Sequence, residues 1–154
     1  MTVNAGKVLL TTTMGNITIQ LYEDMPITSG NFKNLTKQRI FDGTIFHRVV
    51  HGFVIQGGDA CVKGIAVPNI PDELPNKHCN VRGSVAMAKT NEPNSANSQF
   101  YINLKDNLRL DSNYTVFGKV TAGMDVVDAI GNTPTGADDR PLQDVTVTKV
   151  ELIE

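Results

Sequence analysis

The sequence predicts a mostly β protein with about seven or eight short strands and two short helices, arranged as a barrel or a sandwich. Three observations predict this class. β-Branched residues alternate with polar ones in several short segments, turn residues separate these segments, and only two segments have a helical period. With 154 residues, 40% of them hydrophobic and 19% charged, the chain is expected to form a single globular domain over residues 1–154.

The first part of the chain is expected to form a hairpin, a helix and two strands. Residues 7–23, KVLLTTTMGNITIQLYE, alternate between hydrophobic and polar positions after a turn at Met14-Gly15. Pro26 suits the first turn of an amphipathic helix that should end before residue 41. The two strands are expected at residues 44–50 and 53–57.

The second part begins with residues 60–82, which hold three prolines and no lasting period. They predict a long, irregular surface loop with room for a short strand. A second helix is expected at 123–130, and the last strand at 145–153 contains a slip of the hydrophobic phase that predicts a bulge near Thr148. The remaining strands are expected at residues 83–88, 99–102 and 115–120.

Charge and hydropathy exclude several classes of function. The formal net charge is −2, from 14 basic and 16 acidic residues without a block of one sign, so we expect no binding to nucleic acid or to an anionic membrane. No hydrophobic run approaches the roughly 20 residues of a membrane span. The start MTVNAGKVLLTTTMG lacks the features of an export signal, so a cytoplasmic location is expected.

The common catalytic motifs are absent. There is no Walker loop, no GxSxG nucleophile elbow and no HExxH, and the three histidines suggest no metal triad. We therefore expect neither a cofactor nor a metal. Cys61 and Cys79 fit no zinc spacing, and in a reducing compartment two free thiols are expected, with a redox-sensitive pair as the alternative.

A few polar residues interrupt strands that are otherwise apolar. Arg48 and Gln56 lie in FHRVVHGFVIQGGD, and Gln99 precedes Phe100. Taken singly, each could be structural, for example if Arg48 formed an ion pair with Asp59. Taken together, a few oriented donors over an apolar floor are typical of a ligand site. None of these groups titrates near neutral pH, so the set suits peptide binding better than proton transfer.

One long segment of the sequence resembles the signature of a known family. Residues 41–59, FDGTIFHRVVHGFVIQGGD, closely resemble the signature of the cyclophilins, the peptidyl-prolyl cis–trans isomerases, with the pattern F-H-R-x-x-x-G-F-x-x-Q-G-G-D. The resemblance continues at 83–88, 97–102 and 114–120. It implies a closed eight-stranded antiparallel β-barrel capped by two α-helices. It also implies isomerisation of X–Pro bonds in peptides and in folded or unfolded client proteins.

The resemblance assigns roles to ten residues. By similarity, Arg48 is the catalytic group. The nine others bind substrate: Phe53, Val54, Tyr101 and Leu110 form the proline pocket, Gln56 and Gln99 bond the substrate backbone, Ala88 and Lys89 line the peptide groove, and Tyr114 closes the pocket. The backbone of Lys89 is expected to make the strand-like hydrogen bonds.

The chain also departs from the family pattern. Arg109 stands where a tryptophan often helps to bind cyclosporin A, which predicts weakened binding of this drug. The loop after Gly57-Gly58-Asp59 is shorter than usual, which affects the groove beyond the proline pocket. We expect a monomer. Two alternatives stay open: a proline-peptide-binding module or chaperone with weak isomerase activity, and a purely structural barrel with Arg48 in a buried ion pair.

Overall fold

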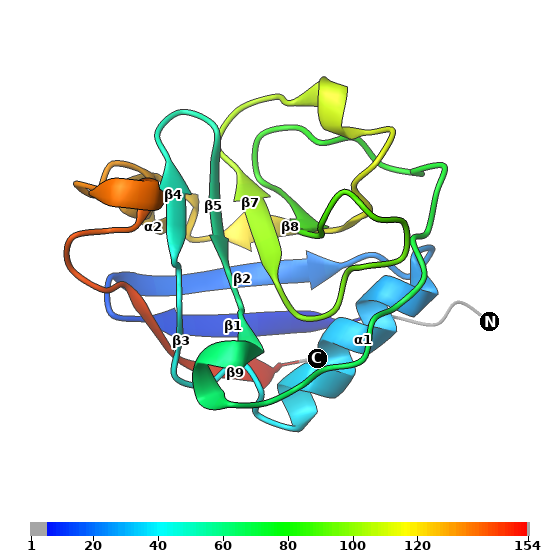
Figure 1. The fold of residues 1–154 in the computed structure, drawn as a ribbon, viewed down its shortest axis with the longest axis horizontal. Coiled ribbons are helices and arrows are strands. Elements are labelled where there is room, and N and C mark those ends of the chain that lie inside the picture. The colour runs from blue at the N-terminus through cyan, green and yellow to red at the C-terminus, as the bar shows by residue number, and fades with distance from the viewer. Residues whose placement is uncertain (1–5, 154) are drawn as a thin grey trace.

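Alternating hydrophobic residues build the first hairpin of the computed structural model, which describes residues 6–153 (Figure 1). Strand β1 (Lys7–Thr12) pairs with β2 (Gly15–Leu21), and the inward-facing Ile17 and Ile19 are fully buried. The predicted hairpin is confirmed, but its turn lies at Thr13-Met14 because Thr12 pairs with Gly15. Residues 1–5, on which part of the expectation about an export signal rests, lie outside the described range.

Two α-helices and seven further strands follow the hairpin. The helices are α1 (Pro26–Lys37) and α2 (Met124–Gly131), as their periods predict. Short 3₁₀ helices occupy Ala60–Lys63, Leu108–Leu110 and Ala137–Asp139. The strands are β3 (Thr44–Ile45), β4 (Arg48–Val50), β5 (Val54–Gly57), β6 (Ser84–Met87), β7 (Phe100–Asn103), β8 (Val116–Ala122) and β9 (Thr146–Leu152).

All nine strands belong to one antiparallel sheet with the order β3-β9-β1-β2-β8-β6-β7-β5-β4. The mostly β class with two helices is confirmed, but the strand count and the closure differ from the expected closed barrel of eight strands. The single strand expected at 44–50 breaks at Phe46-His47, because Phe46 still donates to Val145 next to β9 while Arg48 already pairs with β5. The two ends of the sheet are therefore joined by two residues of chain rather than by a hydrogen-bonded ladder.

The bulge expected in the last strand is present. Thr11 of β1 pairs with Lys149, and Thr12 pairs with Val147, so Thr148 is the extra residue. Val147 and Val150 both remain buried although they differ in phase along the strand. The bulge thus lets β9 keep its hydrophobic residues inside over its whole length.

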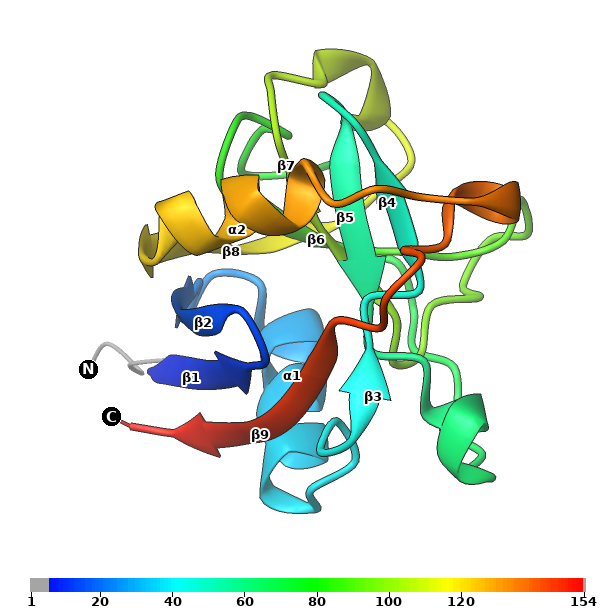
Figure 2. The ribbon, with the colours of Figure 1, turned by 90° about the vertical axis from the view of Figure 1, so that its left-hand side faces the viewer.

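The helices cover different parts of the sheet (Figure 2). Helix α1 contacts β8 and β9, whereas α2 contacts β2, β4 and β5. From α1, the ring of Phe32 packs against Phe41, Phe100 and Phe117 with centroid distances of 4.7, 5.3 and 5.2 Å. This aromatic group fixes α1 against the interior of the sheet and forms the centre of the main core.

The segment expected as a surface loop at 60–82 is mostly irregular, and Ile70 forms an isolated bridge with Ala96. Most of its side chains are exposed or half-buried, but Asn80 is 0% exposed. The description as a surface loop is therefore wrong for Asn80 alone among its last residues, since Cys79, Val81 and Arg82 are exposed. Backbone and side-chain hydrogen bonds hold Asn80 against β7 and the segment that follows it.

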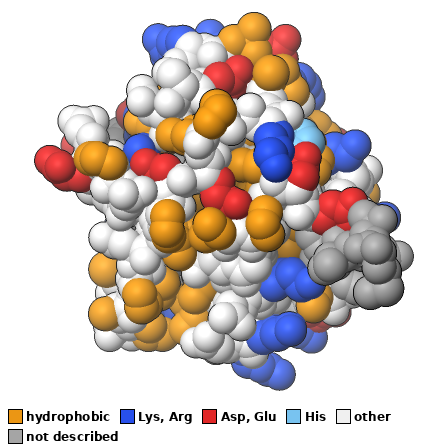
Figure 3. Space-filling model, turned by 90° about the vertical axis from the view of Figure 1, so that its right-hand side faces the viewer, with side chains coloured by type: hydrophobic (Ala, Val, Ile, Leu, Met, Phe, Trp, Pro, Cys, Tyr) orange, Lys and Arg blue, Asp and Glu red, His pale blue; other side chains and the backbone are white. Residues whose placement is uncertain are grey.

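The surface carries charges of both signs. Figure 3 shows basic, acidic and hydrophobic side chains on the same face of the molecule, so no single sign covers it. Within residues 6–153, no helix is long and apolar enough to cross a membrane.

Two glycines give opposite expectations for substitution by alanine. A Cβ at Gly118 in β8 would lie 2.8 Å from the backbone oxygen of Gln20, so Gly118→Ala should destabilise the fold by about 1–3 kcal/mol. At Gly30 in α1 a Cβ meets nothing within 4 Å, so Gly30→Ala should stabilise by about 0.5–1 kcal/mol. Urea unfolding of both variants measures these changes, and equal shifts of one sign would contradict the packing described here.

Candidate active site

The sheet buries side chains on both faces, and this builds a second hydrophobic cluster outside the main core. Along β5, Ile55 points into the main core, whereas Val54 joins the second cluster. The same alternation holds in β6, β7 and β8, because successive side chains of a strand point to opposite faces. The second cluster contains Val54, Ala86, Tyr101 and Val116, with Tyr22, Phe53, Ala88, Leu110 and Tyr114 packed around it.

The strand register aligns the polar residues with this cluster. Arg48 of β4 is paired with Gln56 of β5, Gln56 with Tyr101 of β7, and Tyr101 with Ala86 of β6. These four residues form a row across four strands and share one face of the sheet. Arg48 therefore points away from the main core, and it is half-buried rather than buried.

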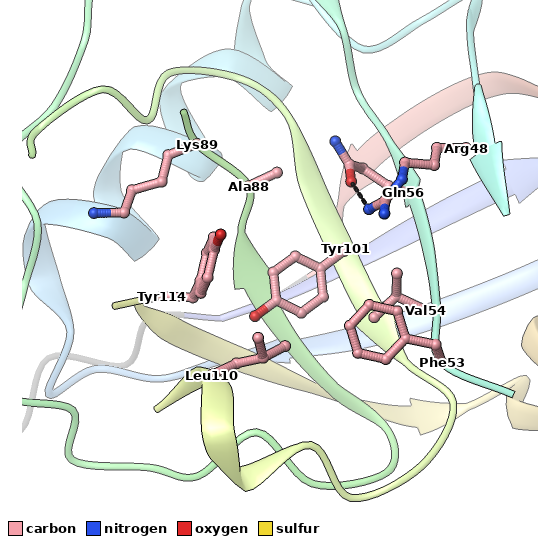
Figure 4. A pocket seen from close by; sticks show the side chains of 9 residues that line it. All are labelled: Arg48, Phe53, Val54, Gln56, Ala88, Lys89, Tyr101, Leu110 and Tyr114. Atoms are coloured by element: carbon pink, nitrogen blue, oxygen red, sulfur yellow. Dashed lines mark hydrogen bonds between the residues drawn. The ribbon is translucent and has the colours of Figure 1, made fainter. Parts of the chain in front are cut away.

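A pocket of about 360 Å³ opens over this row (Figure 4). Nine of the ten residues that the sequence proposed for the site line it: Arg48, Phe53, Val54, Gln56, Ala88, Lys89, Tyr101, Leu110 and Tyr114. The tenth, Gln99, is not in the lining but bonds a residue that is. The ring of Tyr114 meets that of Tyr101 edge to face, with the centroids 6.0 Å apart.

Arg48 is held by a chain of amide side chains. Its Nη1 donates to Oε1 of Gln56 at 3.2 Å, and Nε2 of Gln56 donates to Oε1 of Gln99 at 2.9 Å. Within the described chain, Arg48 makes no ion pair, and Asp59 instead accepts from the backbone of Cys61. The alternative in which Arg48 forms a buried ion pair with Asp59 is therefore wrong.

The chemistry of the lining suits binding and charge stabilisation. Among the nine lining residues there is no carboxylate, imidazole or thiol. In His47, the residue before Arg48 in the sequence, burial lowers the pKa of the imidazole. The charge of Asp59 opposes this shift. The pocket thus offers a guanidinium and amide donors beside aromatic and aliphatic surface, and no obvious proton acceptor for acid–base catalysis.

Comparison with known proteins agrees with this geometry. The model of the family described as "Cyclophilin type peptidyl-prolyl cis-trans isomerase/CLD" matches residues 7–152. The chain belongs to the cyclophilins. It is 44% identical over 155 residues to a peptidyl-prolyl cis-trans isomerase of Acinetobacter baylyi, an alignment covering 92% of this chain and 82% of that protein.

Other relatives extend the comparison. A peptidyl-prolyl cis-trans isomerase of Streptomyces antibioticus is 40% identical over 165 residues, covering 96% of this chain and 99% of that protein. A solved cyclophilin of Cryptosporidium parvum superposes with a TM-score of 0.89 at 26% identity, covering 96% of this chain and 99% of that one. That structure was determined in the presence of the dipeptide Ala-Pro.

The side chain of Lys89 has a structural partner. The side chain extends away from Tyr101 (Figure 4), and its Nζ lies 2.9 Å from Oδ2 of Asp72. Only 9% of the Lys89 side chain and 12% of the Asp72 side chain are exposed. Asp72 also accepts from the backbone of Asn94, so the pair ties together the two loops beside the pocket.

The backbone of Lys89 is a separate feature. It follows β6, after Ala88, whose N–H donates to Gln99. In residues 6–153, the backbone N–H and C=O of Lys89 have no hydrogen-bond partner. Both groups are therefore available to an extended ligand that continues the strand.

Arg109 departs from the cyclophilin pattern, and it lies at the rim of the pocket. Its guanidinium carbon is 5.2 Å from the centroid of the Phe53 ring, within the range of a cation–π contact. Arg109 is exposed, whereas Phe53 is half-buried. A cation therefore covers this side of the pocket, where a tryptophan would present an apolar face.

The cysteines take no part in the pocket. Cys61 and Cys79 are exposed free thiols, as expected for the reduced chain. The negative charges of Asp59 and Asp111 raise the pKa of Cys61 and Cys79, respectively, so less reactive thiolate forms near neutral pH. Both cysteines are therefore weaker nucleophiles than an unperturbed thiol.

Sequence reasoning missed the buried asparagines beneath the pocket. The Tyr101 hydroxyl donates to Oδ1 of Asn80 at 2.7 Å, and burial raises the pKa of this phenol, so it keeps its proton. Asn103 and Asn107 join the same network. Asparagine is common in loops, so no pattern in the sequence distinguishes these residues from ordinary turn residues.

The pair of Lys89 and Asp72 should contribute more to stability than an exposed pair. Because Lys89→Ala leaves a largely buried carboxylate without its cation, we expect a loss of about 3 kcal/mol in the free energy of unfolding. The matched control is Lys149→Ala, whose pair with Glu151 is 55% and 38% exposed and should contribute less than about 1 kcal/mol. Urea denaturation compares the two, and losses of equal size would refute the structural role of Lys89.

Proposed function

We propose that this pocket accelerates rotation about X–Pro peptide bonds, with Arg48 as the catalytic residue. The observation that carries the proposal is the position of Arg48 in a pocket whose walls include Phe53, Tyr101 and Leu110. One of its N–H groups is bonded to Gln56, and in the described chain its other donors have no partner. A guanidinium carries five N–H donors, so Arg48 retains several for a substrate.

The barrier to rotation explains why such a donor accelerates the reaction. The C–N bond has partial double-bond character, and its rotation costs about 18–20 kcal/mol. In the twisted transition state the conjugation is lost, and the prolyl nitrogen becomes pyramidal and regains a lone pair. A hydrogen bond from Arg48 to this nitrogen is stronger in the transition state than in the planar ground state, which is the condition for catalysis.

The other lining residues hold the substrate while the bond turns. Phe53, Tyr101 and Leu110 supply the apolar walls for the prolyl ring. One amide proton of Gln56 is used by Gln99, and the second is available to the substrate backbone. The free backbone groups of Lys89 offer strand-like hydrogen bonds beside it.

The substrates that fit this site are proline-containing peptides and client proteins with accessible X–Pro bonds. The Ala-Pro dipeptide present with the Cryptosporidium parvum relative supports this class. We also propose that the chain acts as a monomer, because the nine lining residues of a single copy already form a pocket of about 360 Å³. The reaction as written uses no cofactor and no metal.

A binding module that isomerises weakly is the alternative function. It would use the same pocket but would not increase the exchange between cis and trans peptide. NMR exchange spectroscopy of a proline peptide distinguishes the two functions, because binding shifts resonances whereas catalysis adds exchange cross-peaks. The oriented Arg48–Gln56–Gln99 chain favours the enzyme, since binding of an apolar ring alone does not require a fixed cation.

Replacement of Arg48 should affect rate far more than stability. We expect Arg48→Ala to lower kcat about 10²–10³-fold, as loss of a preorganised donor does, and Arg48→Lys to lower it less. Because Arg48 is half-buried and makes one side-chain hydrogen bond, the free energy of unfolding should change by about 1 kcal/mol or less. The measurements are cis–trans exchange rates and thermal melting.

The control for Arg48 is Arg140→Ala, since Arg140 is 56% exposed and pairs with Asp144 at the surface. This variant should keep the activity of the unmodified chain. If a folded Arg48→Ala protein were as active as the unmodified chain, the assignment of Arg48 as the catalytic residue would be wrong.

We further propose that Arg109 weakens the binding of cyclosporin A, because a charged, hydrated group covers Phe53 where an indole would bury apolar surface. Arg109→Trp should therefore lower the inhibitory concentration about tenfold, which corresponds to about 1.4 kcal/mol. Lys105→Trp, at a neighbouring exposed position, is the control and should leave inhibition unchanged. Equal inhibition of the original chain and Arg109→Trp would count against this role of Arg109.

A further inference from the structure

Asn80 lies at the centre of a buried hydrogen-bond network beneath the pocket. Its side chain is 0% exposed, and each of its backbone and side-chain polar atoms has a partner. A buried asparagine that is fully bonded in this way is conformationally fixed, since rotation would leave several groups unsatisfied. It does not itself line the pocket.

The side-chain oxygen of Asn80 holds the first wall of the pocket. Oδ1 accepts from the Tyr101 hydroxyl at 2.7 Å and from Nδ2 of Asn103 at 3.1 Å. Asn103 is in turn bonded to Oγ of Ser84 at 2.8 Å, so the network is anchored in β6 and β7. The phenol of Tyr101, which forms this wall, is therefore fixed at its hydroxyl as well as at its Cα.

The nitrogen atoms of Asn80 hold the second wall, formed by Leu110 and Tyr114. Its backbone N and its Nδ2 donate to Oδ1 of Asp111 at 2.6 and 2.9 Å. Asp111 is the C-cap of the 3₁₀ helix that ends at Leu110, and Tyr114 donates its backbone N–H to Leu110. One residue thus connects the wall of Leu110 and Tyr114 with the wall of Tyr101.

A branch of the same network reaches the third wall. The backbone oxygen of Asn80 accepts from Asn107 at 2.8 Å, and Nδ2 of Asn107 donates to the backbone oxygen of Phe53 at 3.2 Å. The Arg48–Gln56–Gln99 chain shares no hydrogen bond with this network. The pocket walls and the catalytic donor are therefore held by separate sets of side-chain hydrogen bonds.

We propose that Asn80 is a positioning residue that fixes the separation of the pocket walls and thereby sets the affinity for the prolyl ring. This inference rests on the proposed function of the pocket. Because the network does not include Arg48, Asn80 acts on substrate binding and leaves the transition-state hydrogen bond intact. The predicted signature is a rise in KM with little change in kcat.

The test is Asn80→Ala, with peptide affinity measured by NMR titration of a proline-containing tetrapeptide and the exchange rate at saturation by exchange spectroscopy. We expect Kd and KM to rise about tenfold and kcat to change less than about twofold. The loop keeps a second anchor in the variant, because Nδ2 of Asn76 bonds the backbone oxygens of Asp111 and Tyr114 at 2.7 Å each.

Thr44→Val is the matched control for a merely structural effect. Thr44 is also 0% exposed, and its hydroxyl donates to the backbone oxygen of Phe41 at 2.6 Å, remote from the pocket. It should lower stability without changing Kd or KM. If Thr44→Val raised KM as much as Asn80→Ala, or if Asn80→Ala lowered kcat and left KM unchanged, the proposal would be overturned.

A second variant keeps the test decisive if Asn80→Ala does not fold. Tyr101→Phe retains the ring and removes only the hydroxyl, so it should raise Kd in the same direction by a smaller factor. Where Asn80→Ala does fold, the two effects should be less than additive in the double variant, because Asn80 acts on the pocket through Tyr101. Additive effects, or an unchanged Kd in Tyr101→Phe, would contradict the coupling of Tyr101 with Asn80.

The proposed isomerase function and the proposed role of Asn80 would be contradicted by different results. If the unmodified chain bound the peptide without raising its cis–trans exchange, the proposed function would fail, and the titration would still report on Asn80. If the unmodified chain catalysed exchange and Asn80→Ala bound the peptide as tightly, only the role of Asn80 would fail.

Discussion

The register of the antiparallel ladder from β4 to β6 is the constraint on which the site depends. It aligns Arg48, Gln56 and Tyr101 in one row, on the face opposite the main core. A slip of one residue would turn Arg48 and Gln56 toward that core and expose Val49 and Ile55 instead. Burying an unpaired guanidinium in such a core is far costlier than keeping it at a half-open pocket. The same pattern that stabilises the sheet therefore orients the site.

Two polar systems meet at the pocket and have different physical tasks. The chain of Arg48, Gln56 and Gln99 orients a permanent charge at the pocket edge. The network around Asn80 contains mostly neutral side chains and is buried, where each unmade hydrogen bond is costly. Rigid walls and an oriented donor are both forms of preorganisation, since they reduce the rearrangement required when substrate binds. Lys89, held by Asp72, and Arg109, over the ring of Phe53, add two cations to the surroundings of this centre.

The features that the sequence predicted correctly depend on local patterns. The hairpin, both helices and the bulge at Thr148 follow from hydrophobic period and turn chemistry within a few residues. The break at Phe46-His47 was missed because it depends on two partners, β9 and β5, that are far apart in the sequence. Asn80 was missed for the same reason, since its partners Tyr101 and Asp111 follow at a distance of many residues.

The sequence by itself determined the mostly β class and the chemical types at the site, because strand patterns and the motif from Phe46 to Asp59 are written in contiguous residues. Through the resemblance to the cyclophilins, it also identified all nine residues that line the pocket. Only the tertiary structure decided that Arg48 lacks a carboxylate partner, that Lys89 is bound to Asp72, and that Asn80 connects the pocket walls. The physical reason is that these contacts join residues far apart in the sequence, which only the folded sheet and its loops bring together. The pattern of neighbouring residues does not specify such long-range contacts.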